Sequence, residues 1–226
     1  VVLLLAAGLS FFVGLGAVPL FDKDEGAFTE ATRYMLASGN YVMTYLNGEP
    51  RYDKPILIYW LQALSATTFG LNEFALRLPS AMAAAAWAAV LWSFARRYLG
   101  SGRAVLATLF LVTAMQVTII GKAAIADAVL NLCITTCLLS IWRYLDSGAV
   151  GWRHLAFAAA GVGMLTKGPV ALLVPALTTL AYYLSRGGWG GWRGALRAWA
   201  GDAFAPAGIT LFAAINLPWY AWAIAD

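Results

Sequence analysis

Long apolar stretches alternate with short polar connections along most of the chain. The first twenty residues carry no charge, and about 20 apolar residues are enough for a helix to span a bilayer. The same pattern continues to the end of the sequence and predicts about seven spans in total. The predicted spans are 1–20, Phe74–Phe94, Val105–Ile120, Ile125–Tyr144, Leu155–Leu165, Pro169–Leu184 and Phe204–Ile224.

A polar segment, residues 21–73, separates the first two predicted spans. Phe28, Ala31 and either Tyr34 or Met35 recur at the spacing of one helix face, so the stretch "DEGAFTEATRYMLASG" predicts a surface helix that ends at Ser38 and Gly39. A turn is expected at "NG", because asparagine and glycine tolerate the backbone angles that turns require.

A second helix is expected after Pro55, in the apolar stretch "ILIYWLQALSATTFG". Proline is well suited to the first turn of a helix. The stretch is short and the next span follows at once, so we expect it to lie in the membrane interface beside the first surface helix.

The composition supports an integral membrane protein. The chain is 62% hydrophobic and 12% charged, whereas soluble domains carry about 25% charged residues. Its net charge of +4 comes from basic residues scattered between apolar segments, so it does not indicate nucleic-acid binding. Cys133 and Cys137 lie within an apolar segment and are interpreted as small buried hydrophobes rather than as a disulfide or a metal pair.

The basic residues indicate the orientation in the membrane. If the N-terminus is cytosolic, eight arginines fall in cytosolic connections, against two acids, Asp146 and Asp202. The arginines are Arg96, Arg97, Arg103, Arg143, Arg153, Arg186, Arg193 and Arg197. Lysine and arginine favour the cytosolic side, which places the acid-rich segment on the periplasmic face of a multi-pass inner (plasma) membrane protein, in contact with membrane lipids.

Candidate chemistry gathers in the outer segment. Six of the eleven carboxylates lie between residues 21 and 55, and Asp24, Glu25, Asp53 and Lys54 stand at the starts of the two surface helices. Asp24 and Glu25 are candidate catalytic carboxylates. A purely structural reading is also open, because acids at a helix start interact favourably with the helix dipole.

Asp127 is the strongest single candidate, because an ionisable residue within a span indicates a functional site by default. We expect it near the outer end of its span, facing the bundle interior, with Lys122 and Lys167 at the same level. The alternative is a structural ion pair with Lys122. Lysines there, with Lys54 and Tyr59, are candidate substrate-binding residues: cations neutralise a lipid phosphate while a carboxylate accepts a proton from an acceptor hydroxyl.

The combined motifs resemble those of the GT-C membrane glycosyltransferases, and most closely the lipid A aminoarabinose transferases and protein O-mannosyltransferases. The shared pattern is "DEG", "MLASG", "LNG", an acid followed by "KP", "YWL", "FG" and "RLPS", and then "AAIADAVL" and "LTKGPVALLVP". Ala27 departs from the aminoarabinose transferase pattern, which has arginine at that place.

The resemblance implies an all-α polytopic helix bundle of GT-C type, of which residues 1–226 form the N-terminal part; further spans and any extramembrane domain are expected beyond it. It also implies inverting transfer of a sugar from a polyprenyl-phosphate donor to a lipid, glycan or protein acceptor. Asp24 matches the catalytic carboxylate, Lys54 the donor-phosphate ligand and Asp127 an acid near the acceptor. Asp53 matches an acid that can take part in binding a divalent metal ion.

Two other classes of function remain open. A transporter or flippase would place charges at mid-depth in its spans, whereas the charges here lie almost entirely at one face. An inactive structural subunit of a larger membrane complex is the other alternative. The sugar and the acceptor are not specified by the sequence.

Overall fold

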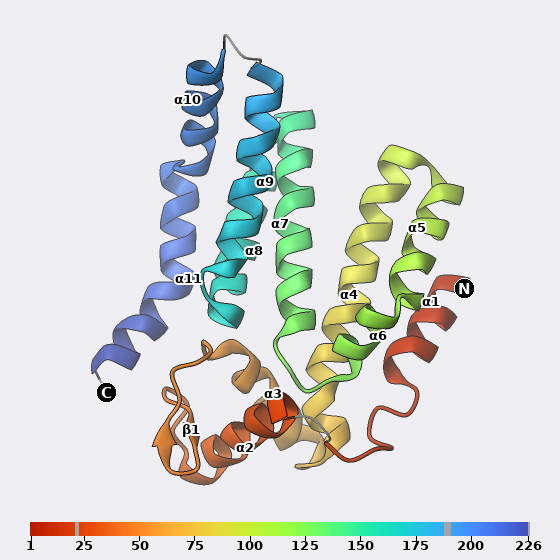
Figure 1. Ribbon diagram of the computed structural model, residues 1–226, viewed down its shortest axis with the longest axis vertical. Helices are drawn as coiled ribbons and strands as arrows, with labels where there is room; N and C mark the ends of the chain where they lie inside the picture. Colours follow the sequence, from red (N-terminus) through yellow and green to blue (C-terminus); the bar gives the residue numbers. More distant parts are fainter. Residues whose placement is uncertain (21–22, 188–190, 226) are drawn as a thin grey trace.

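The computed structural model describes residues 1–20, 23–187 and 191–225, and its regular structure is almost entirely helical (Figure 1). The predicted all-α class is therefore confirmed in this part of the chain. The described helices are α1 (Val2–Ala7), the short π-helix η1 (Gly8–Phe12), α2 (Lys23–Ser38), α3 (Leu57–Phe69), α4 (Glu73–Leu99), α5 (Ser101–Thr113), α6 (Met115–Lys122), α7 (Asp127–Ser147), α8 (Val150–Lys167), α9 (Val170–Gly187), α10 (Trp192–Ala203) and α11 (Pro206–Ala225).

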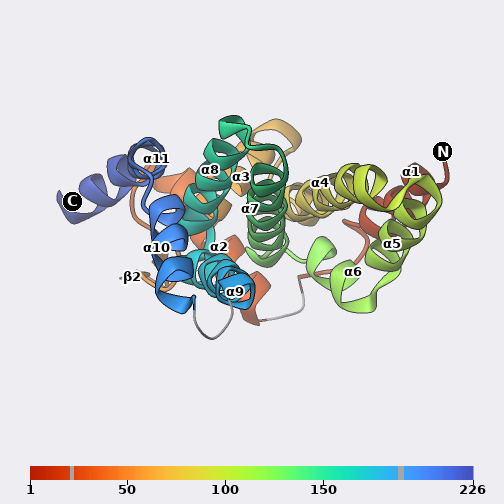
Figure 2. The same ribbon diagram turned by 90° about the horizontal axis from the view of Figure 1, so that it is seen from above.

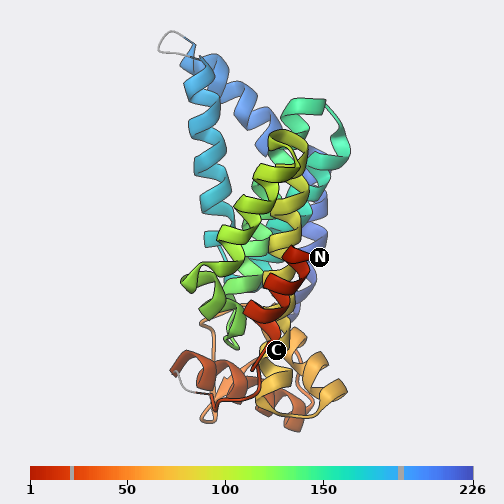
Figure 3. The ribbon, with the colours of Figure 1, turned by 90° about the vertical axis from the view of Figure 1, so that its right-hand side faces the viewer.

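The polar segment folds into a compact unit at one end of the molecule, which we call the outer lobe (residues 23–72). Both predicted surface helices are present there as α2 and α3, and they lie below the long helices in Figures 1 and 3. Strands β1 (Tyr45–Leu46) and β2 (Glu49–Pro50) form an antiparallel hairpin between them. Its turn is the predicted one: Asn47 and Gly48 have positive φ angles of 55° and 85°, as tight hairpin turns require.

The long helices rise from the outer lobe in two groups. Helices α1, α4, α5 and α6 form one group and α7 to α11 the other, a division that is also clear from above (Figure 2). Helix α7 contacts both α4 and α8, so it joins the two groups.

Judged by length and composition alone, fewer of the described helices qualify as membrane spans than the seven predicted from the sequence. Within the described residues, three helices are long and apolar enough to do so, α4, α7 and α11. The number rises to four if α5 and α6, which meet at a bend of 61°, count as one broken span. The predicted span Val105–Ile120 is therefore interrupted, because Ala114 adopts an extended backbone conformation between the two helices.

The first predicted span is also shorter than expected. Its apolar helix covers only Val2–Phe12, and the chain then turns at Gly14, whose φ of +72° favours glycine. Hydropathy alone missed this end, since the residues that follow the turn are still apolar.

One continuous apolar core joins the outer lobe to the long helices. It includes Phe28, Met35 and Ile58 from the lobe, and Ala84 and Val129 from α4 and α7. Cys133 belongs to the same core, and both cysteines are free and buried, which confirms their interpretation as small hydrophobes. The lobe is therefore packed onto the bundle as part of one unit.

Candidate active site

The first turn of α2 presents two neighbouring carboxylates to different surroundings. Helix α2 begins at Lys23, so Asp24 and Glu25 both lie in its first turn. The Asp24 side chain is exposed, while Glu25 is only 1% exposed. Consecutive residues point about 100° apart around a helix, which explains how one carboxylate faces solvent and the other faces the protein.

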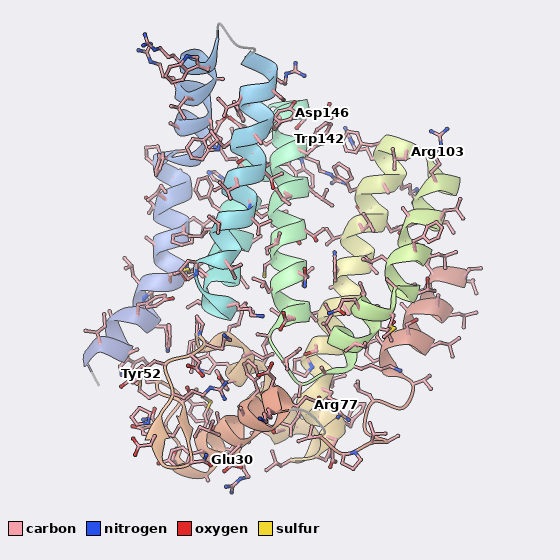
Figure 4. The ribbon with its side chains drawn as sticks, in the orientation of Figure 1. Glu30, Tyr52, Arg77, Arg103, Trp142 and Asp146 are labelled. Carbon is pink, nitrogen blue, oxygen red and sulfur yellow. The ribbon has the colours of Figure 1, made fainter. Side chains whose placement is uncertain are left out.

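Glu25 forms a buried ion pair with Arg77 of α4. Arg77 Nε donates to Glu25 Oε1 at 2.9 Å, and Arg77 Nη2 donates to Glu25 Oε2 at 2.8 Å. Both side chains are almost completely buried, at 1% and 2% exposure. Such parallel pairing is the strong geometry for arginine and a carboxylate, and it ties the start of α2 to α4. Figure 4 labels Arg77 at the outer-lobe end of the molecule.

The remaining donors of Arg77 hold the segment that precedes the outer lobe. Arg77 Nη1 donates to the carbonyls of Leu15 and Val18 at 3.1 and 2.7 Å, and Nη2 donates to Pro19 O at 3.0 Å. Together with the two bonds to Glu25, these contacts use all five N–H donors of the guanidinium. Arg77 is therefore a fully satisfied buried cation that links three parts of the chain.

Asp127 pairs with Lys167, not with Lys122. Lys167 Nζ lies 2.7 Å from Asp127 Oδ1, and both side chains are about one-third exposed. Lys122 instead donates to the carbonyl of Val13 at 2.9 Å. The structural pair considered from the sequence is therefore wrong in its partner: Lys122 lies on α6, before the turn that leads into α7, whereas Lys167 ends the neighbouring α8.

Asp127 lies where the outer lobe meets the long helices. Ala124, Ala126 and Ala128 are fully buried, and the backbone N–H of Ala124 donates to Glu25 Oε1 at 2.7 Å. The start of α7 is thus held directly against the start of α2. This contact brings the chain segments of Asp24 and Asp127 together.

The end of the hairpin carries Arg51, Asp53 and Lys54. Arg51 Nε is 3.5 Å from Asp53 Oδ2, a distance too long for a strong hydrogen bond, and the Asp53 side chain is 72% exposed. Lys54 is half-buried. The described residues contain no group of three or more histidine, cysteine or acidic side chains that could hold a metal ion. Asp53 therefore lacks the co-ligands that a metal site would need in this part of the chain.

Tyr59 lies fully buried in the same region, with its ring against Phe28 at a centroid distance of 5.5 Å. Burial raises the pKa of Tyr59 to about 12, the Asp53 carboxylate adds to this rise, and the Arg51 and Thr44 side chains oppose it. The phenol is therefore protonated near neutral pH and able to donate. The Thr44 hydroxyl donates to the Arg51 carbonyl at 2.8 Å, and the Tyr59 hydroxyl has no well-formed hydrogen bond among the described residues.

Arg51 is a residue that the sequence reasoning missed. Its guanidinium stacks over the Phe28 ring at 5.3 Å, and its side chain is only 9% exposed. Its Nε and Nη1 atoms are buried without a hydrogen-bond partner among the described residues. Buried polar groups are normally paired, so Arg51 and Tyr59 together leave donors available for a ligand oxygen. The "RYDKP" stretch offered a signal, since Arg51 stands three positions before Lys54.

We expect the Asp127–Lys167 pair to matter more for activity than for stability. An ion pair with this degree of exposure contributes about 0–1 kcal/mol, so Asp127→Asn should shift the melting midpoint little and still lower the catalytic rate. Lys167→Met should have the same effect on the rate and on the melting midpoint as Asp127→Asn if the two side chains act together. Parallel loss of activity and melting temperature in the Asp127 variant would instead mark a structural role.

The family comparison matches most of the chain. A family model described as dolichyl-phosphate-mannose-protein mannosyltransferase matches residues 53–222. The chain is 30% identical over 217 residues, 93% of its length, to an undecaprenyl phosphate-alpha-4-amino-4-deoxy-L-arabinose arabinosyl transferase of Edwardsiella ictaluri. It is 32% identical over 194 residues to the protein of the same name from Pseudomonas aeruginosa, a match that covers 83% of the chain. The chain spans 38% and 35% of the lengths of these two curated relatives.

Solved structures show the same architecture. ArnT from Cupriavidus metallidurans superposes on 98% of the chain with a TM-score of 0.86 and 27% sequence identity, and the match covers 41% of ArnT in the apo state. The structure of the same protein bound to undecaprenyl phosphate matches equally well over 40% of its chain. These matches confirm the predicted all-α polytopic bundle of GT-C type.

Proposed function

Because the chain belongs to the dolichyl-phosphate-mannose-protein mannosyltransferase family, we propose that it is part of an inverting glycosyltransferase that uses a polyprenyl-phosphate sugar donor. The observation that carries this proposal is the junction between the outer lobe and the bundle. There the exposed Asp24 and the Asp127–Lys167 pair lie on chain segments that Glu25 holds together. The acceptor is a lipid, glycan or protein; the curated relatives are arabinosyl transferases by name.

We assign the role of general base in the transfer step to Asp24. Its carboxylate is exposed and has no hydrogen bond or ion pair to the residues that the structure describes, so it is available to accept the proton of an acceptor hydroxyl. The acceptor oxygen then forms a bond to the anomeric carbon from the face opposite the phosphate. The bond from that carbon to the phosphate oxygen breaks, and the polyprenyl phosphate leaves with the bonding electrons.

Glu25 takes a different role from Asp24. Its carboxylate is buried and accepts from Arg77 and from the Ala124 backbone, an arrangement that stabilises its charge and keeps it away from solvent. We therefore assign Glu25 to positioning rather than to proton transfer. Asp127, beside Lys167, remains the second candidate carboxylate and is assigned to the acceptor.

We assign the binding of the lipid-linked phosphate to the cations and hydrogen-bond donors around the hairpin and at the helix ends. Lys54 and Tyr59 belong to this set. Arg51 is an addition, because its buried Nη1 has no hydrogen-bond partner among the described residues, and its Nε makes only a 3.5 Å contact with the exposed Asp53 carboxylate. Lys122 and Lys167 complete the set from the ends of α6 and α8. Cations and neutral donors together stabilise a phosphate leaving group as its charge develops. No step is assigned to a metal ion.

The membrane location of this site is assigned to the periplasmic face of the inner membrane. Arg103 and Asp146 lie at the opposite end of the bundle from Glu30, Tyr52 and Arg77 (Figure 4). Among the described residues, the Asp146 carboxylate accepts a hydrogen bond from Tyr98, and the Asp202 carboxylate accepts one from Tyr144. The arginine-rich end then faces the cytosol, as the bias of basic residues towards that side requires.

We expect the protein to release polyprenyl phosphate as it transfers a labelled sugar to an acceptor in membrane extracts. The assay should use polyprenyl-phosphate sugars and, in parallel, nucleotide sugars as donors. Transfer from the lipid-linked donor alone supports the proposal. Transfer from the nucleotide donor alone, or translocation of the lipid-linked sugar across vesicles with no new glycosidic bond, would refute it.

A further inference from the structure

The backbone immediately before Asp127 is held by side chains from three different helices. Residues 123–126 connect α6 to α7 and form the short link that ends at Asp127. Glu25 of α2 accepts from the N–H of Ala124 at 2.7 Å. Gln62 of α3 donates from Nε2 to the carbonyl of the same residue at 3.0 Å. Both polar groups of Ala124 are thus bound by the outer lobe.

A third contact comes from α4. Ser80 Oγ donates to the carbonyl of Ile125 at 2.9 Å. Glu25, Gln62 and Ser80 are between 0% and 1% exposed, so water does not compete for these bonds. The link is therefore held at two successive residues by side chains rather than by regular secondary structure.

Gln62 also extends the connection into α2. Its Oε1 accepts from the Thr32 hydroxyl at 2.7 Å, and Thr32 is fully buried. A polar chain thus runs from Thr32 through Gln62 to Ala124. Buried polar side chains in an apolar environment are retained only when they are paired, and here both ends of the Gln62 amide are satisfied.

From these contacts we infer that Gln62 and Ser80 are positioning residues, which hold the link 123–126 and so set the place of Asp127 relative to the outer lobe. This inference rests on the proposed role of Asp127 in sugar transfer. Neither residue reaches the reacting groups itself. Their effect is on geometry, and a displacement of about 1 Å at a reacting group can reduce a rate by about 10²-fold.

The inference is tested with Ser80→Ala and Gln62→Met, which remove the two donors with small changes in volume. Ser80→Thr keeps a hydroxyl and serves as the conservative variant. Ser140→Ala is the matched control, because Ser140 is a buried serine on α7 and makes no contact with the link. Each variant is compared for kcat, KM, thermal stability and amide hydrogen exchange of residues 123–126.

We expect Ser80→Ala and Gln62→Met to lower kcat by about 10- to 100-fold with KM little changed, while Ser80→Thr recovers most of the rate. Hydrogen exchange should accelerate at residues 123–126 and remain as in the control elsewhere. Equal kcat in Ser80→Ala, Gln62→Met and Ser140→Ala overturns the inference, as does unchanged exchange of the link. A lower melting temperature with unchanged kcat would show that the contacts are structural only.

Failure of the proposed function gives a different result. If the unmodified protein transfers no sugar from any polyprenyl-phosphate donor, the glycosyltransferase proposal fails, whereas the exchange measurement still decides whether Gln62 and Ser80 hold the link. If the unmodified protein is active and the variants are equally active, only the positioning inference fails.

Discussion

Replacement of Arg77 by alanine is expected to prevent stable folding of the protein. The change removes both hydrogen bonds of Arg77 to the buried Glu25 carboxylate, and removal of one partner of a buried ion pair typically costs about 3–5 kcal/mol. Three backbone carbonyls, those of Leu15, Val18 and Pro19, lose their donor as well. Since whole domains are stable by only about 5–15 kcal/mol, the loss should be visible as poor yield, aggregation or a strongly lowered melting midpoint in detergent.

A surface ion pair supplies the control for this prediction. On the exposed face of α2, Arg33 Nη2 lies 2.6 Å from Glu30 Oε1. Arg33→Ala therefore also removes an arginine charge, but from a solvent-exposed ion pair. We expect this variant to melt close to the unmodified protein. Equal melting midpoints for the Arg77 and Arg33 variants would contradict the account of a buried link.

The double variant Arg77→Met with Glu25→Gln separates the ion pair from its other contacts. Removing both charges avoids a buried carboxylate that has lost its contacts with Arg77, so the double variant should be more stable than Arg77→Met alone. Recovery should be partial, because the carbonyls that Arg77 binds would still lack a donor. Arg77→Lys should fall between these cases, since an ammonium keeps the charge but cannot form the parallel pair.

The sequence predicts the helical class and the two surface helices, because both depend on local periodicity and on turn residues such as Asn47 and Gly48. It does not predict where the first helix ends. The residues after Phe12 are still apolar, and the break arises from the backbone conformation at Gly14. Hydropathy therefore overestimates the length of spans that end in apolar turns.

The site is predicted at the level of residue type and only partly at the level of contacts. The pattern places Asp24 and Glu25 together at a helix start, but which of them is buried depends on Arg77, far away in the sequence. The partner of Asp127 is set in the same way by the packing of α8 beside α7. Spacing along one helix cannot give contacts between helices, and this is why Lys122 was the wrong partner.

Gln62 and Ser80 illustrate a second kind of omission. Each is a polar residue within a mostly apolar helix, and the sequence shows no reason for its presence. The reason is the backbone link before Asp127, whose Ala124 and Ile125 carbonyls need hydrogen-bond donors in the core. An isolated polar residue in an apolar helix thus indicates a buried hydrogen bond to another part of the chain, even though its partner cannot be identified without the structure.

Asp24→Asn is expected to reduce sugar transfer by about 10²–10⁴-fold, the range typical for loss of a general base. Asparagine keeps the size of the side chain and cannot accept a proton near neutral pH. Because Asp24 is exposed and lies at the start of α2, folding and membrane insertion should be preserved. The measurement is kcat with a polyprenyl-phosphate sugar donor, together with the melting midpoint of the purified protein.

Glu30→Gln is the matched control, since Glu30 is also an acid on α2 and pairs only with the exposed Arg33 among the described residues. It should retain nearly full activity. If the only role of Asp24 is to stabilise the start of α2, its carboxylate contributes about 0.3–1 kcal/mol to stability through the helix dipole. Asp24→Asn would then lower the melting midpoint slightly and leave kcat near that of the Glu30 variant. That result would remove Asp24 from the chemical step. A large fall in kcat at unchanged stability, with KM for the lipid donor also unchanged, would place its effect in the transition state rather than in donor binding.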